Sequence, residues 1–177
     1  MDLKGSQTEK NLKEAFSGES QARNKYTYYA SQAKKEGYEQ ISAIFLESAE
    51  NEKEHAKILY RYLGGINDTK ANLLDAAAGE HYEWSEMYKN FEKKAIEEGF
   101  TEIAGFFREV GEVEEEHEKR YNALIQNLNE GSVFKQPTSV RWHCRNCGYV
   151  HEGTEAPDAC PCCSHPKAYF ELYPENY

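Results

Sequence analysis

The chain has 177 residues and a mass of 20.4 kDa, which fits one domain of about 100–150 residues with a small second module. Its 21 basic and 31 acidic residues give a net charge of −10, and the basic residues form no cluster. This charge pattern argues against a surface that binds nucleic acid. The mean hydropathy of −0.88 excludes a predicted membrane span, and the opening residues lack the apolar core of a secretory signal. We therefore expect a cytoplasmic protein.

Residues 6–129 contain no proline and are rich in helix formers, which indicates a helical region. Glycines and one polar stretch divide this region into four predicted helices, at 8–35, 38–63, 70–97 and 100–129. The two halves of the region repeat, since 62 positions separate Gly37 from Gly99 in similar surroundings. The same offset relates Tyr26 to Tyr88, Glu52 to Glu114 and His55 to His117. A duplicated helical hairpin predicts an all-α four-helix bundle.

Each predicted helix carries an apolar stripe at helical spacing, and acidic residues interrupt every stripe near its middle. The stripes include Ile41, Ile44 and Phe45 in the second helix and Ile103, Phe106 and Phe107 in the fourth. The interrupting acids are Glu19, Glu52, Glu80 and Glu114, with His55 and His117 on the same stripes and Glu83 one turn beyond Glu80. So many charges in a core are costly unless cations offset them. One Glu from each of two helices and a Glu-x-x-His from the other two is the ligand pattern of helix-bundle di-metal sites, so the sequence predicts two bound metal ions.

Several of these residues have a second interpretation. A single Glu-x-x-His in an acidic chain is usually a solvated helix face, and only its repetition at core positions favours metal binding. Glu83 alone would suit a helix surface, although its spacing from Glu80 makes it a candidate extra ligand. Tyr26 and Tyr88 are either core tyrosines or groups that hydrogen-bond to the ligand carboxylates.

The C-terminal segment has a different chemistry, because all five cysteines lie after residue 143. Clustered thiols in a reducing compartment indicate a metal rather than disulfides. Two Cys-x-x-Cys loops supply a tetrahedral sulfur site for zinc or one iron, namely Cys144 with Cys147 and Cys160 with Cys163. Cys162 is an extra thiol outside both pairs. A module of about 38 residues is too small to be held by a core alone, so the metal is expected to be part of its fold.

The change of composition predicts where the modules meet. We expect the bundle at 1–134, a linker at 135–140 and a small β-rich domain at 141–177. The linker is indicated by Gln136-Pro137-Thr138-Ser139.

In this order the two constellations resemble the rubrerythrins, which combine a ferritin-like di-iron bundle with a rubredoxin-like domain. The resemblance extends from residues 14–23 to residues 166–172. The Cys147-Gly148-Tyr149 and Cys160-Pro161 segments look like rubredoxin loops, which favours iron over zinc. The resemblance implies one iron bound by Glu19, Glu52, Glu83 and Glu114, with His55 replacing Glu83 on reduction. It implies a second iron bound by Glu52, Glu80, Glu114 and His117. Position 162 departs from the family pattern, because this chain has a cysteine where the pattern has a residue that does not bind metal.

The resemblance also implies a function. The expected reaction is the reduction of hydrogen peroxide to water, as a protection against oxidative stress. Electrons would pass through the four-cysteine iron from an external NAD(P)H-dependent reductase or a rubredoxin. Two alternatives stay open: a ferroxidase, iron-storing or oxidase relative of ferritin, and a structural zinc ribbon beside a separate oxidase.

The connection between the second and third predicted helices bears on the oligomeric state. Residues 63–70 must cross back along the bundle, and at about 3.3–3.6 Å per extended residue they barely span it. Short hinges favour domain exchange. We therefore expect a homodimer in which helices 1–2 of one chain can pair with helices 3–4 of another. A structure with all seven bundle ligands from one chain would refute the exchange.

Overall fold

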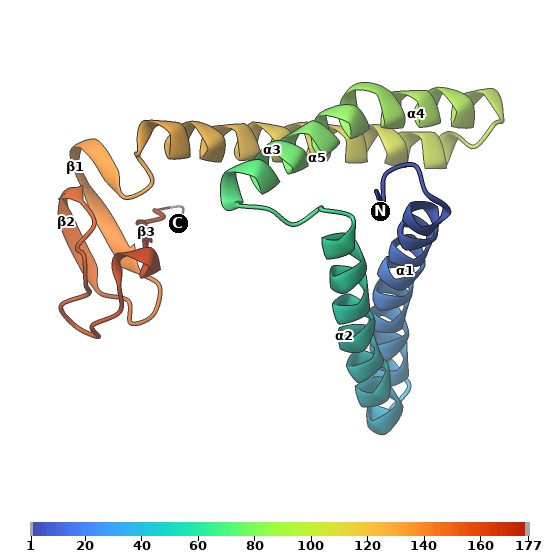
Figure 1. The fold of residues 1–177 in the computed structure, drawn as a ribbon, viewed down its shortest axis with the longest axis horizontal. Coiled ribbons are helices and arrows are strands. Elements are labelled where there is room, and N and C mark those ends of the chain that lie inside the picture. Colours follow the sequence, from blue (N-terminus) through green and yellow to red (C-terminus); the bar gives the residue numbers. More distant parts are fainter. Residues whose placement is uncertain (1, 176–177) are drawn as a thin grey trace. The chain divides into compact units, whose positions relative to one another are not determined.

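The computed structural model describes residues 2–175. The predicted domains at 1–134 and 141–177 include Met1 and residues 176–177, which lie outside the described residues. The chain divides into two compact units, Met1–Asp68 and Thr69–Tyr177. The first unit holds one helical hairpin, and the second holds another hairpin followed by a small sheet (Figure 1). Within the described range, none of the helices combines the length and the apolar character needed to cross a membrane.

The first hairpin consists of α1 (Gln7–Lys35) and α2 (Glu39–Tyr62), which lie side by side (Figure 1). The Ser6 hydroxyl caps α1 by accepting a hydrogen bond from the backbone N–H of Glu9. Gly37 makes the turn at φ +85°, where a side chain would be strained. Small residues dominate the buried positions of these helices, which are Ala30, Ala33, Ser42, Ala49 and Ala56. They allow α1 and α2 to approach closely.

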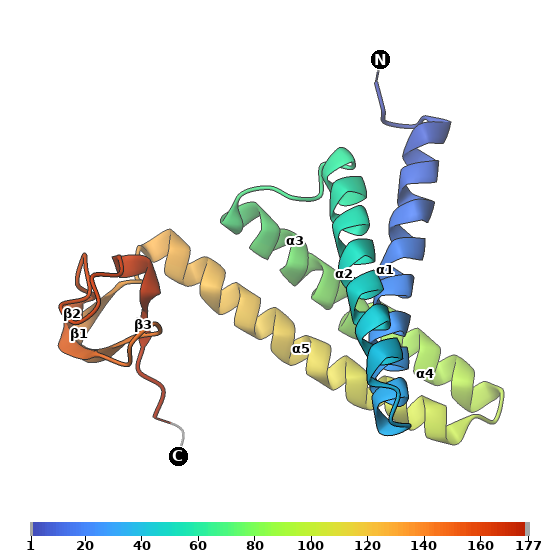
Figure 2. The ribbon, with the colours of Figure 1, turned by 90° about the horizontal axis from the view of Figure 1, so that it is seen from below.

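The second hairpin pairs α5 (Thr101–Glu130) with a helix that changes its winding midway. This helix begins as α3 (Thr69–Tyr82), passes through the π-helical turn η1 (Glu83–Met87) and continues as α4 (Tyr88–Glu97). Figure 2 shows α5 running alongside all of these segments. All four predicted helices are present, with ends within one residue of those expected. The π turn is a departure from the uninterrupted helix predicted at 70–97.

The predicted apolar stripes do not form the contact inside each hairpin. Ile44 is 55% exposed and Phe106 is 63% exposed, and Ile41 and Ile103 are exposed as well. The reason is geometric, because two helices cover only the faces along which they meet. Those faces carry the alanines, which are one position away from the stripe in α2 and α5. Within each hairpin these four residues are exposed, and their place in the core of a four-helix bundle stays a prediction.

The C-terminal segment is a three-stranded antiparallel sheet in the order β2-β1-β3, which confirms the predicted β-rich module. Its strands are β1 (Lys135–Cys144), β2 (Val150–Glu155) and β3 (Phe170–Leu172), with a short helix η2 (Lys167–Tyr169) before β3. Residues 135–140, expected to be a linker, belong to β1. Lys135 pairs with Glu155 and Val140 with Gly153 across an irregularity in register, so backbone hydrogen bonds tie this segment to the sheet.

Trp142 is the largest side chain of the small core that the sheet builds, and it is 0% exposed. Its indole Nε1 donates a hydrogen bond to the carbonyl oxygen of Gly153 at 3.0 Å. Two metal-ligand candidates, Cys144 and Cys160, belong to the same core as Trp142, Ala156 and Phe170. Packing and metal binding in this module are therefore coupled.

We expect Trp142→Ala to destabilise the C-terminal module by about 3–5 kcal/mol, because it empties the centre of a small core. Trp142→Phe is the matched control, since it retains an aromatic ring and removes one hydrogen bond at a cost of roughly 1–2 kcal/mol. Guanidinium unfolding of the metal-loaded protein, followed by the metal–thiolate absorption, measures both. Equal losses for the two variants would contradict the packing role.

Candidate metal centres

The four predicted cysteines meet at one point of the C-terminal module. Their sulfur atoms all lie within 4.8 Å of one another, with Cys144 Sγ 3.8 Å from Cys163 Sγ and Cys147 Sγ 3.6 Å from Cys160 Sγ. A tetrahedral site with metal–sulfur bonds of about 2.3 Å has sulfur–sulfur edges of about 3.8 Å. The four thiols thus fit a metal ion of this kind. Cys162 is exposed and lies outside the cluster, as the spacing predicted.

The two Cys-x-x-Cys loops have the same backbone geometry. The N–H of Gly148 donates to the carbonyl oxygen of Cys144 at 2.9 Å, and the N–H of Ser164 donates to that of Cys160 at 2.8 Å. Both closing residues have positive φ, +80° for Gly148 and +60° for Ser164. This conformation is natural for glycine and uncommon for serine. The loop at Ser164 is therefore held by its surroundings, including the N–H of Cys160, which donates to His165 O at 2.8 Å.

The environment of Cys163 favours the form of sulfur that binds metals. A hydrogen bond from the backbone N–H of His165 lowers the pKa of the Cys163 thiol to about 6. A thiol with such a pKa is mostly thiolate at neutral pH, and thiolate is the metal ligand. Cys144 and Cys160 are buried while Cys147 is exposed, so the site has one side that faces solvent.

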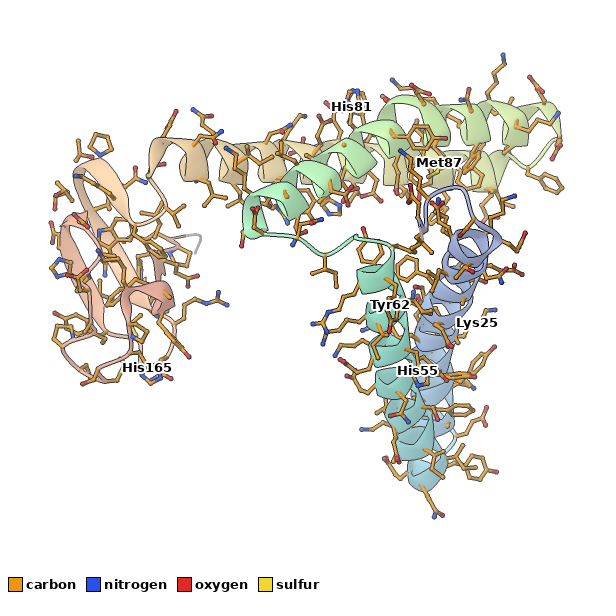
Figure 3. The ribbon with its side chains drawn as sticks, viewed as in Figure 1. Lys25, His55, Tyr62, His81, Met87 and His165 are labelled. Atoms are coloured by element: carbon orange, nitrogen blue, oxygen red, sulfur yellow. The ribbon has the colours of Figure 1, made fainter. Side chains whose placement is uncertain are left out.

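The first hairpin gathers one carboxylate–imidazole cluster. Glu19 of α1 and Glu52 and His55 of α2 bring their ligand atoms within 4.8 Å of one another. His55 Nδ1 lies 2.7 Å from Glu52 Oε2 and 3.9 Å from Glu19 Oε1. Glu52 and His55 share a face because they are three residues apart in the helix. Figure 3 shows His55 on α2, in the hairpin with α1.

The second hairpin repeats this cluster with Glu80, Glu114 and His117, whose ligand atoms also lie within 4.8 Å of one another. His117 Nδ1 is 2.7 Å from Glu114 Oε2 and 3.6 Å from Glu80 Oε1. The sequence repeat is therefore a structural repeat of the predicted ligands. Six of the seven predicted bundle ligands fall into two matching groups of three, one in each hairpin.

The carboxylates in both clusters are crowded in a way that a cation would relieve. Burial, and then the neighbouring Glu52 carboxylate, raise the pKa of Glu19 above its usual value. Burial, and then the negative charge of Glu114, raise the pKa of Glu80 in the same manner. Hard oxygen ligands with one imidazole suit iron and similar divalent metals. The residues present therefore fit the predicted metal ions.

Glu83, the seventh predicted ligand, lies beside the second cluster without being one of its three members. It opens the π turn η1, and its charge helps to raise the pKa values of Glu80 and Tyr88. Burial is the largest cause of the raised pKa of Tyr88, followed by Glu83 and Glu114. The Glu83 carboxylate is thus close enough to act on this site electrostatically.

The two candidate tyrosines occupy equivalent places. The ring of Tyr26 lies 6.1 Å from that of Phe45, and the ring of Tyr88 lies 6.1 Å from that of Phe107, between centroids. Both tyrosines are half-buried. Tyr88 is close enough to the second cluster for the charges of Glu83, Glu114 and Glu80 to raise its pKa. The direct roles of both hydroxyls stay predictions.

The π turn η1 was missed by reading the stripes, although the repeat contains a signal for it. Glu52 and Glu114 are 62 positions apart, as are Tyr26 and Tyr88, but Glu19 and Glu80 are 61 apart. One extra residue therefore lies between Glu80 and Tyr88, relative to the first half of the repeat. A π turn accommodates one such residue inside a helix, and these turns occur often at functional sites.

Comparisons with known proteins find matches to both parts of the chain. The rubrerythrin family model matches residues 10–125, and the model of the rubrerythrin rubredoxin-like domain matches residues 142–171. Rubrerythrin of Nitratidesulfovibrio vulgaris is 53% identical, over 99% of this chain and 98% of its own length. Rubrerythrin of Porphyromonas gingivalis is 52% identical, over 99% of this chain and 94% of its own length.

Among solved structures, partially reduced nigerythrin is 33% identical with a TM-score of 0.38, covering 95% of this chain and 87% of its own. The family matches confirm the predicted fold class, a ferritin-like helical domain followed by a rubredoxin-like domain. The Glu and His groups of the di-iron site and the four cysteines of the rubredoxin-like site are both present. With a relative of 53% identity over nearly its full length and family matches to both of its parts, the chain belongs to the rubrerythrin family.

Proposed function

We propose that this protein reduces hydrogen peroxide to water, protecting the cytoplasm against oxidative stress. The reaction consumes one peroxide, two electrons and two protons and yields two waters. Bound iron supplies the electrons and the Lewis acidity that cleavage of the O–O bond requires. The observation that carries the proposal is the presence, in one chain, of two matching carboxylate–imidazole clusters and a four-thiolate site. The two carboxylate–imidazole clusters can hold two metal ions, and the four-thiolate site suits one-electron transfer.

The ligand set proposed for the bundle follows the family pattern on this chain's residues. Glu52 and Glu114 would each contact both ions, because each is the central member of its cluster, 2.7 Å from the histidine. The remaining ligands are Glu19, Glu80, His117 and, in exchange with one another, Glu83 and His55. The geometry in support is the side-by-side placement of carboxylate and imidazole in each hairpin.

Tyr88 and Tyr26 are proposed to border the reacting site. A tyrosine hydroxyl is protonated at neutral pH, and burial and then Glu83 raise the pKa of Tyr88 further, so its hydroxyl can donate a hydrogen bond. The aromatic pair that each tyrosine forms is proposed to limit the access of water to the carboxylates. These residues would hold and orient the oxygens of a small substrate.

Electrons are proposed to enter at the C-terminal module, from an external NAD(P)H-dependent reductase or a rubredoxin. Cys147 is the exposed member of the four-cysteine cluster, so its side offers a partner the shortest approach. The free thiols of the whole cluster suit a reducing cytoplasm.

A homodimer with exchanged hairpins is proposed as the assembly. Only residues 63–68 connect α2 to α3, and each hairpin carries one complete cluster of three ligands. Exposed apolar residues on both hairpins, such as Ile44 and Phe106, need a helical partner. A hairpin of either kind from a second chain would supply one.

Anaerobic stopped-flow absorbance of the fully reduced protein tests the reaction. Mixing with hydrogen peroxide is expected to restore the ferric–thiolate absorption rapidly, and mixing with oxygen to restore it slowly. Faster return with oxygen would contradict the peroxidase and favour an oxidase or ferroxidase. Metal analysis accompanies the measurement, because zinc at the four cysteines would eliminate electron relay.

A further inference from the structure

The contact face of the second hairpin contains an acidic residue where the first hairpin has alanine. Along α5 this face recurs every seven residues, at Ala104, Gly111, Glu118 and Ile125. With the repeat offset of 62, Glu118 corresponds to Ala56, which is buried against α1. A carboxylate in such a place is costly unless hydrogen bonds satisfy it. The substitution therefore requires a partner that the first hairpin does not have.

Glu118 has that partner in the π turn. Its Oε2 accepts a hydrogen bond from Trp84 Nε1 at 2.5 Å and lies 3.1 Å from His81 Nδ1. Its Oε1 accepts one from the amide of Asn122 at 3.3 Å. The side chain is only 19% exposed, and the hydrogen bond from Trp84 is the main cause of its lowered pKa. Glu118 is thus a carboxylate with hydrogen-bond partners on both of its oxygens.

These contacts lie on either side of Glu83 in the chain. His81, labelled in Figure 3, belongs to the last turn of α3, and Trp84 to η1. Oε2 of Glu118 contacts both His81 and Trp84, so the backbone between these two residues is held against α5. Glu83 lies on that backbone.

A second difference between α5 and the first hairpin lies beside the end of the same turn. Gly111 stands where the first hairpin has Ala49, and a Cβ at Gly111 would come 3.4 Å from Cβ of Tyr88. Tyr88 is the first residue after η1. Two positions on the contact face of α5 therefore differ from the first hairpin at the places where η1 and its end pack.

We propose that Glu118 is a positioning residue that fixes the π turn, and through it the carboxylate of Glu83, at the metal site. The inference rests on the proposed ligand role of Glu83 and not on the peroxidase reaction. Glu118 does not contact the metal. Its role is to bind Trp84 and His81. Without these contacts, the π turn that accommodates the extra residue could form at another position along the helix, and Glu83 would move with it.

The test is anaerobic titration of the apo-protein with Co²⁺, read from its visible absorption, in which thiolate and carboxylate sites differ. Glu118→Ala is expected to weaken Co²⁺ binding in the bundle by about 10–100-fold and to leave the four-cysteine site unchanged. Glu118→Gln retains an acceptor for Trp84 and is expected to restore most of the affinity. Trp84→Phe, which removes the indole donor, is expected to reproduce the loss. Glu116→Ala, an exposed neighbour paired with Lys119, is the charge-matched control with no effect.

A double-mutant cycle with Glu83→Ala separates positioning from general damage. If Glu118 acts through Glu83, Glu118→Ala adds no further loss of Co²⁺ affinity in the Glu83→Ala chain. An equal loss in both backgrounds would overturn the proposal, as would unchanged binding in Glu118→Ala when Glu83→Ala weakens it. If Glu83→Ala itself leaves binding intact, the ligand role of Glu83 and the positioning role of Glu118 both fail, while the stopped-flow test of the peroxidase stays independent.

Discussion

Replacing Glu52 or Glu114 with alanine is expected to lower the rate of peroxide reduction by at least about 100-fold and to abolish binding of two irons per site. Each carboxylate is the central member of its cluster, next to the histidine and to the acid of the neighbouring helix. Its removal takes a ligand from both proposed ions and leaves the remaining acids crowded. Iron analysis and the stopped-flow rate with peroxide measure the two effects.

Glu50→Ala and Glu116→Ala are the matched controls for these substitutions. Both carboxylates are exposed, lie within two residues of a proposed ligand and pair with lysines, Lys53 and Lys119. Each control removes the same charge from the same helix, so neither is expected to change the iron content or the rate. If a control behaved like its partner variant, the loss would come from net charge or helix stability, and the proposed ligand roles would be wrong.

The same pair of variants tests the exchanged homodimer. When chains with Glu52→Ala and Glu114→Ala are co-expressed with different tags, an exchanged heterodimer has one site lacking both residues and one intact site. About a quarter of all sites would then bind two irons and react with peroxide. Without exchange every site lacks one ligand, so no recovery of activity in the co-expressed sample would contradict the exchange.

Cys147→Ser is expected to remove the ferric–thiolate absorption and most peroxide turnover supported by an external reductase, while the bundle still binds iron. Cys147 is one of four sulfurs whose spacing fits a tetrahedral metal. The module is expected to depend on that metal for part of its stability. The serine oxygen is a poor substitute for thiolate at such a site. Absorption spectra, iron content and steady-state turnover with a reductase are the measurements.

Cys162→Ser is the control for this variant, since it makes the same chemical change in the same module. Cys162 is exposed and lies outside the four-sulfur cluster, so its replacement is expected to leave colour, iron content and turnover unchanged. Loss of colour in Cys162→Ser, or retention of it in Cys147→Ser, would show that the ligand set is wrongly assigned.

The helices and most of the proposed site could be predicted from the sequence because both depend on spacing along one chain. Glu52 and His55 face the same way in any α-helix, and so do Glu114 and His117. The repeat then brings Glu19 and Glu80 to equivalent places. The cysteine loops are local as well, since four residues of each loop determine the distance between its two sulfurs.

Other features could not be read in this way because they depend on what packs against a helix. Within their own hairpins α2 and α5 meet their partners along alanines and glycine, and the stripe with Ile44 and Phe106 is left exposed. The core position predicted for that stripe depends on a further helical partner. Helical periodicity identifies an apolar face without naming its partner. The segment at 135–140 has the composition of a linker, but pairing with β2 makes it a strand.

The sequence by itself determined the helix boundaries, the internal repeat, the two groups of predicted Glu and His ligands and the four-cysteine cluster, because each follows from residue spacing within a helix or a loop. The repeat signals one extra residue before Tyr88, but only the tertiary structure decided that it forms a π turn at Glu83–Met87 and which residue anchors that turn. Trp84 and Glu118 are 34 residues apart, and nothing local favours their hydrogen bond. It forms because α5 lies against η1, so the position of Glu83 is set by a contact between helices.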